Sequence, residues 1–124
     1  MLYKEKDDKL CLDVPATDKT VTLEVTCFNA TTAKVSYYYS GLKVANCGDA
    51  VDVGIANTLK GAKRAYNGNG SNPLGGKFKV KHVFTSPNGK KLTYVFPDDY
   101  TGTPAYNADD ELPDYRFIVN FRAV

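Results

Sequence analysis

The chain of 124 residues carries 16 basic and 14 acidic side chains, which give a formal charge of +2, and 43% of its residues are hydrophobic. This length predicts a single domain, residues 1–124, with one hydrophobic core. The small net charge excludes a strongly basic nucleic-acid-binding protein, and no segment has the roughly 20 consecutive apolar residues that a membrane-spanning helix needs.

The first third of the chain is predicted to form an arm followed by a β-hairpin. Residues 1–19 are polar, contain Pro15, and are expected to form an arm or an edge strand. From residue 20 onward, apolar and polar side chains alternate, which is the pattern of a half-buried strand. A turn at Asn29–Thr32 separates this strand from a second alternating run, so residues 20–40 are predicted to be a hairpin.

A change of period then predicts one long helix over residues 48–66. Asp49 follows a glycine and is a suitable N-cap, whereas Gly54 and Gly61 lower the helix propensity. The apolar stripe of this helix recurs at spacings of three and four residues and consists of Val51, Ile55, Leu59, Ala62 and Tyr66.

Three strands are predicted in the second half of the chain, after a glycine-rich loop at 67–76. The first begins at Lys77, the turn Ser86-Pro87-Asn88-Gly89 leads into the second, and the last ends at Phe121. Residues 77–121 are therefore expected to form an antiparallel meander. The predicted fold class is α+β, with an N-terminal β-hairpin and one α-helix packed on a curved antiparallel sheet.

The cysteines leave the cellular compartment open. Cys11, Cys27 and Cys47 form no C-x-x-C pair, so a structural zinc site is not expected. One disulfide with a remaining thiol would fit an exported protein, and three thiols would fit a cytosolic one. Residues 1–9 lack the apolar region of a signal peptide, while the triplets at 29–31 and 69–71 have the pattern of N-glycosylation acceptors.

Alternating cations suggest a surface that binds phosphate groups. If the two strands that carry them are neighbours, their lysines and arginines form a cationic strip for RNA. The alternative is that these lysines keep a strand face soluble and guard its edge. The candidate phosphate-binding residues are Lys77, Lys79, Lys81, Arg116 and Arg122, with Asn120 between the arginines, and Tyr38 and Tyr100 are candidates for base stacking or protein contact.

His82, the single histidine, shares a strand face with Phe78, Val80 and Phe84, which predicts a place in the core. Acid–base hydrolysis of RNA usually needs two proton-transfer groups, so one histidine is a poor basis for catalysis. The acidic residues at 98–99 and 109–111 lack the spacing of a calcium loop, and the glycine-rich loop lacks the lysine of a phosphate loop. We expect no catalytic site, no metal and no cofactor.

Several pieces follow one another in a fixed order between Ala45 and Phe121. A cysteine precedes the predicted helix, a Gly/Ser/Asn loop follows it, and an aromatic strand ends in proline. A Tyr/Gly loop and an Arg-led apolar strand complete the pattern. The segments concerned are Asn46-Cys47-Gly48-Asp49, the loop 67–76, Tyr94-Val95-Phe96-Pro97, Tyr100-Thr101-Gly102-Thr103-Pro104 and Pro113-Asp114-Tyr115-Arg116-Phe117-Ile118-Val119. This order resembles the small fungal guanyl-specific ribonucleases and the ribonuclease-like effectors of powdery mildew fungi.

The active-site pattern of those enzymes is mostly missing here. The segment 72–77 has neither the Tyr nor the His expected there, Val95 stands at the position of the catalytic carboxylate, and the strand with the second histidine has no counterpart. Arg116 matches the phosphate-contacting arginine. No cysteine follows Cys47, so the family's N-to-C-terminal disulfide has no counterpart either.

The resemblance implies a secreted, non-catalytic fungal effector that acts as a monomer inside a plant host cell. Its partners would be a host protein, such as a plant immune receptor, or RNA. Two other interpretations remain open: an active small ribonuclease that uses His82 and Arg116, and a β-rich binding module unrelated to nucleases.

Overall fold

The computed structural model describes residues 10–28, 32–37, 44–71, 77–96, 106–107 and 115–124. These residues form mostly strands, together with one short helix, α1 (Ala56–Leu59). One sheet has the strand order β1-β10-β6-β3-β4, and the other has the order β5-β2-β7-β8 with β9 also paired to β7. Every pairing is antiparallel except β1 with β10.

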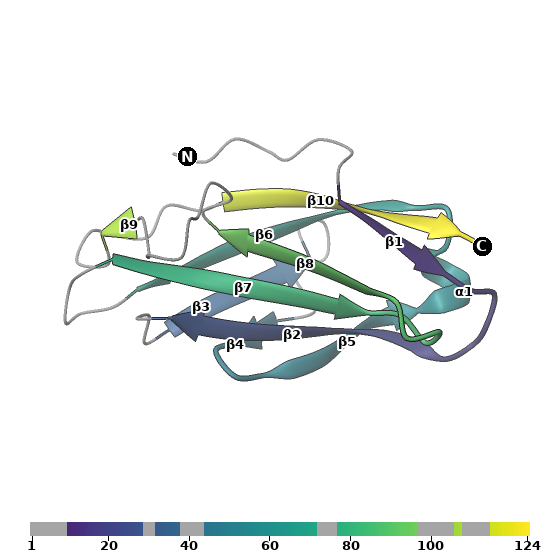
Figure 1. The fold of residues 1–124 in the computed structure, drawn as a ribbon, viewed down its shortest axis with the longest axis horizontal. Coiled ribbons are helices and arrows are strands. Elements are labelled where there is room, and N and C mark those ends of the chain that lie inside the picture. The colour runs from purple at the N-terminus through teal and green to yellow at the C-terminus, as the bar shows by residue number, and fades with distance from the viewer. Residues whose placement is uncertain (1–9, 29–31, 38–43, 72–76, 97–105, 108–114) are drawn as a thin grey trace.

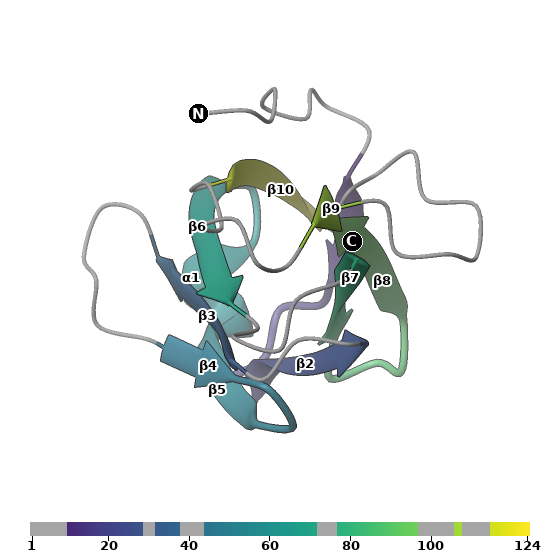
Figure 2. The same ribbon diagram turned by 90° about the vertical axis from the view of Figure 1, so that its left-hand side faces the viewer.

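The strands of the first sheet are β1 (Cys11–Val14), β10 (Tyr115–Ala123), β6 (Lys63–Ser71), β3 (Thr32–Tyr37) and β4 (Val44–Asn46). Those of the second are β5 (Ala50–Ile55), β2 (Thr20–Phe28), β7 (Lys77–Thr85), β8 (Lys91–Phe96) and β9 (Tyr106–Asn107). Seen along the strands, the two sheets curve around one interior (Figure 2). The strands at their ends come close to each other, β1 to β8 and β4 to β5, so the two sheets nearly close into a barrel.

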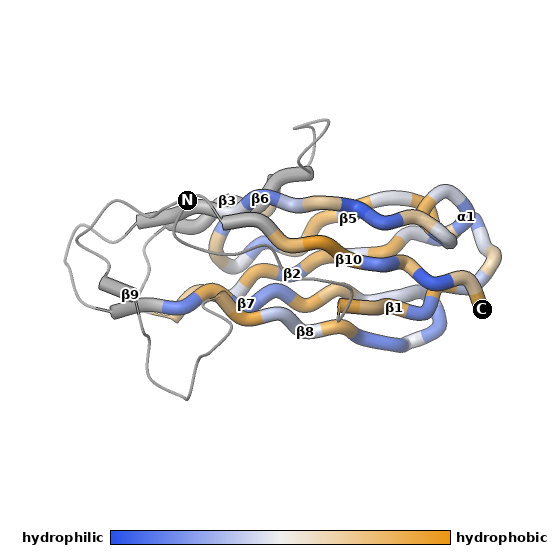
Figure 3. The backbone as a smooth tube through the Cα atoms, turned by 90° about the horizontal axis from the view of Figure 1, so that it is seen from above, coloured by the Kyte–Doolittle hydropathy of each residue, from blue (hydrophilic) through white to orange (hydrophobic). Residues whose placement is uncertain are grey.

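The hydrophobic core lies between the two sheets. Hydrophobic and hydrophilic residues alternate along β2 and β7, as expected for strands with one buried face (Figure 3). Both sheets contribute fully buried side chains to one cluster, among them Leu12, Val21, Val25, Val80, Phe84, Phe96, Phe117 and Phe121. Within the described residues, no helix is long and apolar enough to cross a membrane.

The predicted helix over 48–66 is wrong. These residues form a turn, β5, the four-residue α1 and the beginning of β6 (Figure 1). Val51, Val53 and Ile55 are β-branched and alternate with other residues, a pattern that a strand satisfies as well as a helix. Gly54 has φ 156°, which a helix cannot contain, and pairing shifts by one residue beside it, as in a β-bulge.

The predicted hairpin over 20–40 is also wrong, because its two strands belong to different sheets. β2 pairs with β5 and β7, whereas β3 pairs with β4 and β6. Sequence alternation locates a strand and its buried face, but it does not identify the partner. Both strands do exist close to their predicted positions.

The predicted meander over 77–121 is correct only in its first half. β7 and β8 form a hairpin, and its turn is closed by the amide of Gly89, which donates to the carbonyl oxygen of Ser86 at 2.9 Å. The last strand, β10, crosses to the other sheet and pairs with β6 and β1. The edge strand expected within residues 1–19 is confirmed for Cys11–Val14.

The coarse α+β class is confirmed, with strands dominating the described residues. The element packed on the antiparallel sheet is a second sheet, because α1 spans only four residues.

Candidate binding surface

His82 lies in the core, as its sequence neighbours predict. Its side chain is 0% exposed and its ring lies between Tyr94 and Phe117, with ring centroids 5.3 and 5.0 Å away. The imidazole Nδ1 lies 3.0 Å from the carbonyl oxygen of Tyr94. A carbonyl oxygen only accepts, so Nδ1 carries the proton and donates it.

Burial also sets the charge of this ring. Desolvation lowers the pKa of His82 from 6.5 to about 4, against a smaller opposing effect of the hydrogen bond to Tyr94. The imidazole is therefore neutral at pH 7 and out of contact with solvent. This placement gives no support to a ribonuclease site built on His82 and Arg116, because a general acid or base must reach the substrate.

Lys79 and Lys81 lie on the outward face of β7, opposite the buried face that carries Val80 and His82. Their direct cross-strand partners on β2 are Phe28 and Thr26. Directly paired residues of an antiparallel sheet share one face. We call these four residues, Thr26, Phe28, Lys79 and Lys81, the β2–β7 patch.

Phe28 distinguishes this patch from an ordinary solvated strand face. Three large hydrophobic residues are exposed among the described residues, and Phe28, at 39%, is the aromatic one. The ammonium nitrogen of Lys79 lies 4.2 Å from the centre of its ring, a cation–π contact. The patch therefore presents an aromatic ring and two lysine side chains on adjacent strands.

The condition for the predicted cationic strip is not met, because β7 and β10 lie in different sheets and are not neighbours. Arg122, near the end of β10, instead pairs with Asp13 of β1, with Arg122 Nε 2.7 Å from Asp13 Oδ1. This hydrogen bond holds the pKa of the Asp13 carboxyl below its usual value. Arg122 thus helps to tie β1 to β10, on the other sheet from the patch.

The remaining predicted residues are placed less completely. Lys77 pairs with Asn107 of β9, and Arg116 pairs with Asn67 of β6, but only their backbone positions belong to the described structure. Tyr38 and Tyr100 lie outside the described residues. No group of His, Cys, Asp or Glu in the described part of the chain could hold a metal ion.

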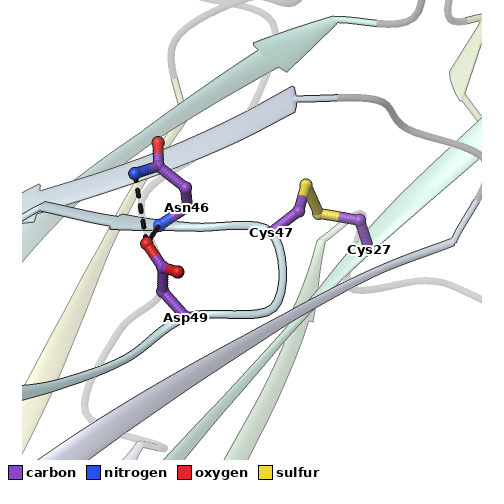
Figure 4. The surroundings of a disulfide bond; sticks show 4 residues. All are labelled: Cys27, Asn46, Cys47 and Asp49. Atoms are coloured by element: carbon purple, nitrogen blue, oxygen red, sulfur yellow. Dashed lines mark hydrogen bonds between the residues drawn. A yellow bond between two sulfur atoms is a disulfide. The ribbon is translucent and has the colours of Figure 1, made fainter.

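A disulfide supports the end of β2 next to the patch. Cys27 is bonded to Cys47 with a Cα–Cα distance of 5.4 Å, and Cys11 is not part of a disulfide. Cys47 lies in a turn whose Asp49 carboxylate accepts hydrogen bonds of 3.2 Å from both the backbone and the side-chain amide of Asn46 (Figure 4). Asp49 thus closes a turn and does not cap a helix.

The two lysines were predicted from the sequence as surface residues, but Phe28 was not. The signal was present, because Phe28 continues the alternation of β2 on the polar face that contains Thr22, Glu24 and Thr26. An aromatic residue on the solvent face of a strand is a candidate contact residue. Comparisons of the chain with protein-family models, with curated proteins and with solved structures found no match.

Proposed function

We propose that this chain is an exported binding domain that contacts an acidic surface of a partner protein through the β2–β7 patch. The observation that carries the proposal is the cross-strand pair Phe28–Lys79 beside Lys81. An exposed aromatic ring flanked by cations offers apolar contact area and charge complementarity together, which protein interfaces combine.

Several features favour a protein partner over RNA. The described patch offers two lysines, which correspond to a salt-dependence slope of only about −1.4 for single-stranded nucleic acid and hence to weak binding. The ammonium of Lys79 lies over the ring of Phe28, where a stacked base would have to sit. RNA binding stays a prediction of the sequence, and the experiment below tests it.

The disulfide supports export. A single Cys27–Cys47 bond with a remaining thiol at Cys11 is the pattern expected of an exported protein, since disulfides persist in oxidising compartments. A fungal effector role, action inside a plant host cell and contact with an immune receptor rest on the sequence resemblance alone. A ribonuclease-like architecture also rests on it, and the long helix which that architecture needs is not formed.

Binding to polyanions of two classes tests the proposal. The purified protein is titrated by fluorescence anisotropy with labelled poly-glutamate and with a labelled single-stranded oligouridine of equal charge. We expect tighter binding to poly-glutamate, and a loss of about tenfold in the Lys79→Glu/Lys81→Glu variant. Lys60→Glu is the matched control, because Lys60 is exposed at the end of α1, outside the patch.

Equal affinity of the patch variant and the Lys60→Glu control for poly-glutamate would overturn the proposal. Tighter binding to oligouridine than to poly-glutamate would show that the patch prefers RNA to an acidic protein surface, which would also overturn the proposal. Phe28→Ala tests the apolar part of the contact. We expect this variant to bind more weakly than the parent chain, and we expect that part of the loss to differ from the weakening that added salt causes by screening charge.

A further inference from the structure

The second sheet carries opposite charges on different strands of the face that points away from the core. The acidic half of this face consists of Glu24 on β2 and Asp52 on β5, both exposed. The basic half consists of Lys79 and Lys81 on β7 and Lys91 on β8. Direct pairing and two-residue spacing place all five on one face. Because the strand order is β5-β2-β7-β8, the two halves meet between β2 and β7 (Figure 1).

The charges next to this boundary are not neutralised by each other. Glu24 lies directly opposite Val83 of β7, and Lys81 lies directly opposite Thr26 of β2. Glu24 and Lys81 are therefore diagonal neighbours on adjacent strands. Neither side chain forms an ion pair with any residue that the structure describes. Both remain available to a partner of opposite charge.

Apolar side chains extend along the same face. Val83 and Val95 are half-buried on it, on β7 and β8. Of the three exposed large hydrophobic residues in the described structure, two belong to this face, Phe28 at 39% and Ile55 at 43%. Phe28 ends β2, and Ile55 lies opposite Thr20, which begins β2. The face thus offers apolar contact along its whole length, between and beside its charges.

The two halves of the face are complementary to each other under a two-fold rotation. An axis parallel to the strands, between β2 and β7, places β2 over β7 of a second copy and β5 over its β8. Glu24 then lies over the second copy's Val83 and next to the second copy's Lys81. Asp52 lies over the second copy's Lys91, because both are paired into the row of Thr22 and Thr85. An axis across the strands would instead place lysines over lysines, so charge selects the first arrangement.

The size of the face corresponds to a weak dimer. β2 has nine residues, which span about 27 Å at about 3.4 Å per residue, and four strands about 4.8 Å apart span about 14 Å. The contact area is then at most about 400 Å² per copy, or about 800 Å² in total. Interfaces below about 1,200 Å² are weak and transient, so we expect a dissociation constant of about 10–100 μM.

We propose that the acidic surface contacted by the β2–β7 patch is the acidic half of a second copy of this chain, in a symmetric dimer. The inference rests on the proposed function and names its partner. The contact between Glu24 and Lys81 occurs twice in such a dimer, and Phe28 of each copy lies over Lys79 of the other. The resemblance described above implies a monomer, so the oligomeric state decides between the two expectations.

Charge reversal tests the pairing of Glu24 with Lys81. Sedimentation equilibrium of the parent chain from about 10 μM to about 1 mM should show a monomer–dimer equilibrium. Glu24→Lys sets lysine against lysine and Lys81→Glu sets carboxylate against carboxylate. We expect each variant to raise the dimer dissociation constant at least about tenfold. An equimolar mixture of the two variants should associate again, because one carries only lysine and the other only glutamate at the two positions.

The matched controls make the same charge changes outside this face. Asp18→Lys changes an exposed residue in the turn between β1 and β2, and Lys60→Glu changes an exposed residue at the end of α1. Both should associate like the parent chain. Thermal unfolding of every variant shows that the loss of association is not a loss of folding, and the mixture of variants gives a gain of association that unfolding cannot produce.

The outcomes separate this inference from the proposed function. A parent chain that remains monomeric at about 1 mM overturns the dimer, and so does association that neither charge reversal weakens or that their mixture fails to restore. In each case, poly-glutamate binding that depends on Lys79 and Lys81 leaves the proposed function standing with another protein as partner. Glu24→Lys distinguishes the two directly, because it should associate less but bind poly-glutamate at least as tightly as the parent chain. The proposed function fails in a different measurement, equal poly-glutamate affinity of the patch variant and the Lys60→Glu control.

Discussion

Acidification should destabilise this protein through its one histidine. The pKa of His82 is about 4 in the folded chain and 6.5 in an unfolded one, because burial disfavours the imidazolium. Above pH 6.5 the ring is neutral in both states and stability has its full value. Between 6.5 and about 4 the unfolded chain binds a proton that the folded chain does not, so stability falls as the pH falls.

The loss of stability follows from the difference between the pKa of His82 in the unfolded chain and its pKa in the folded chain. One pKa unit corresponds to about 1.4 kcal/mol, so the interval from 6.5 to about 4 corresponds to about 3 kcal/mol. The loss is complete below pH 4, where both states are protonated. About 3 kcal/mol is a large share of the stability of a domain of this size.

Urea unfolding followed by circular dichroism at several values between pH 7 and 4 measures the effect. The control is His82→Leu, which keeps an apolar side chain in the core and titrates no imidazole. Carboxylates titrate alike in both proteins, so the difference between the two pH profiles isolates His82. Parallel profiles would refute the reasoning, and so would an imidazole NMR titration of the folded protein with a midpoint near 6.5.

Two further predictions concern covalent and steric features of the fold. The disulfide closes a loop with a sequence separation of 20 residues, so Cys27→Ser with Cys47→Ser should lower the unfolding free energy by about 3 kcal/mol in urea unfolding. Thiol titration of the denatured, unreduced parent chain should detect one thiol, Cys11, and a count of three would contradict the bond. Gly54→Ala places a Cβ 3.1 Å from the buried side chain of Leu59 at φ 156°, and should cost about 1–3 kcal/mol in the same assay, whereas an unchanged urea midpoint would show that the bulge relaxes freely.

The features predicted correctly from the sequence are those fixed by neighbouring residues. Alternation along residues 20–28 identified β2 and its buried face. The turn that ends at Gly89 and the burial of His82 were recognised because a turn and a strand face are local properties. Each of these depends on residues within a few positions of one another.

The helix prediction failed where two periods overlapped. Val51 and Ile55 fit a stripe of four-residue spacing, and Val51, Val53 and Ile55 fit a two-residue alternation equally well. β-branched side chains and Gly54 favour the strand, and pairing with β2 supplies hydrogen bonds that a helix would make internally. The tertiary partner decided the outcome, and the sequence does not show which partner is available.

For the candidate surface, the sequence shows which residues share a strand face but not which strands are neighbours. Lys79 and Lys81 share a face because they are two residues apart on one strand, which the sequence shows. Their neighbours come from β2, some fifty residues earlier, and that pairing is set by the strand order of the sheet. Arg122 was assigned to the same strip only because its strand was expected to follow β8 in the same sheet.

The position of Cys27 limits where the proposed function can operate. Cys27 packs against the core between Thr26 and Phe28, whose side chains belong to the patch on the opposite face. Its bond to Cys47 therefore holds the strand end that presents Phe28. The cytosol reduces accessible disulfides, and reduction would weaken the fold and the patch together. A partner in an extracellular or secretory compartment suits this chemistry, and a partner in a host cytosol requires that the half-buried bond resist reduction.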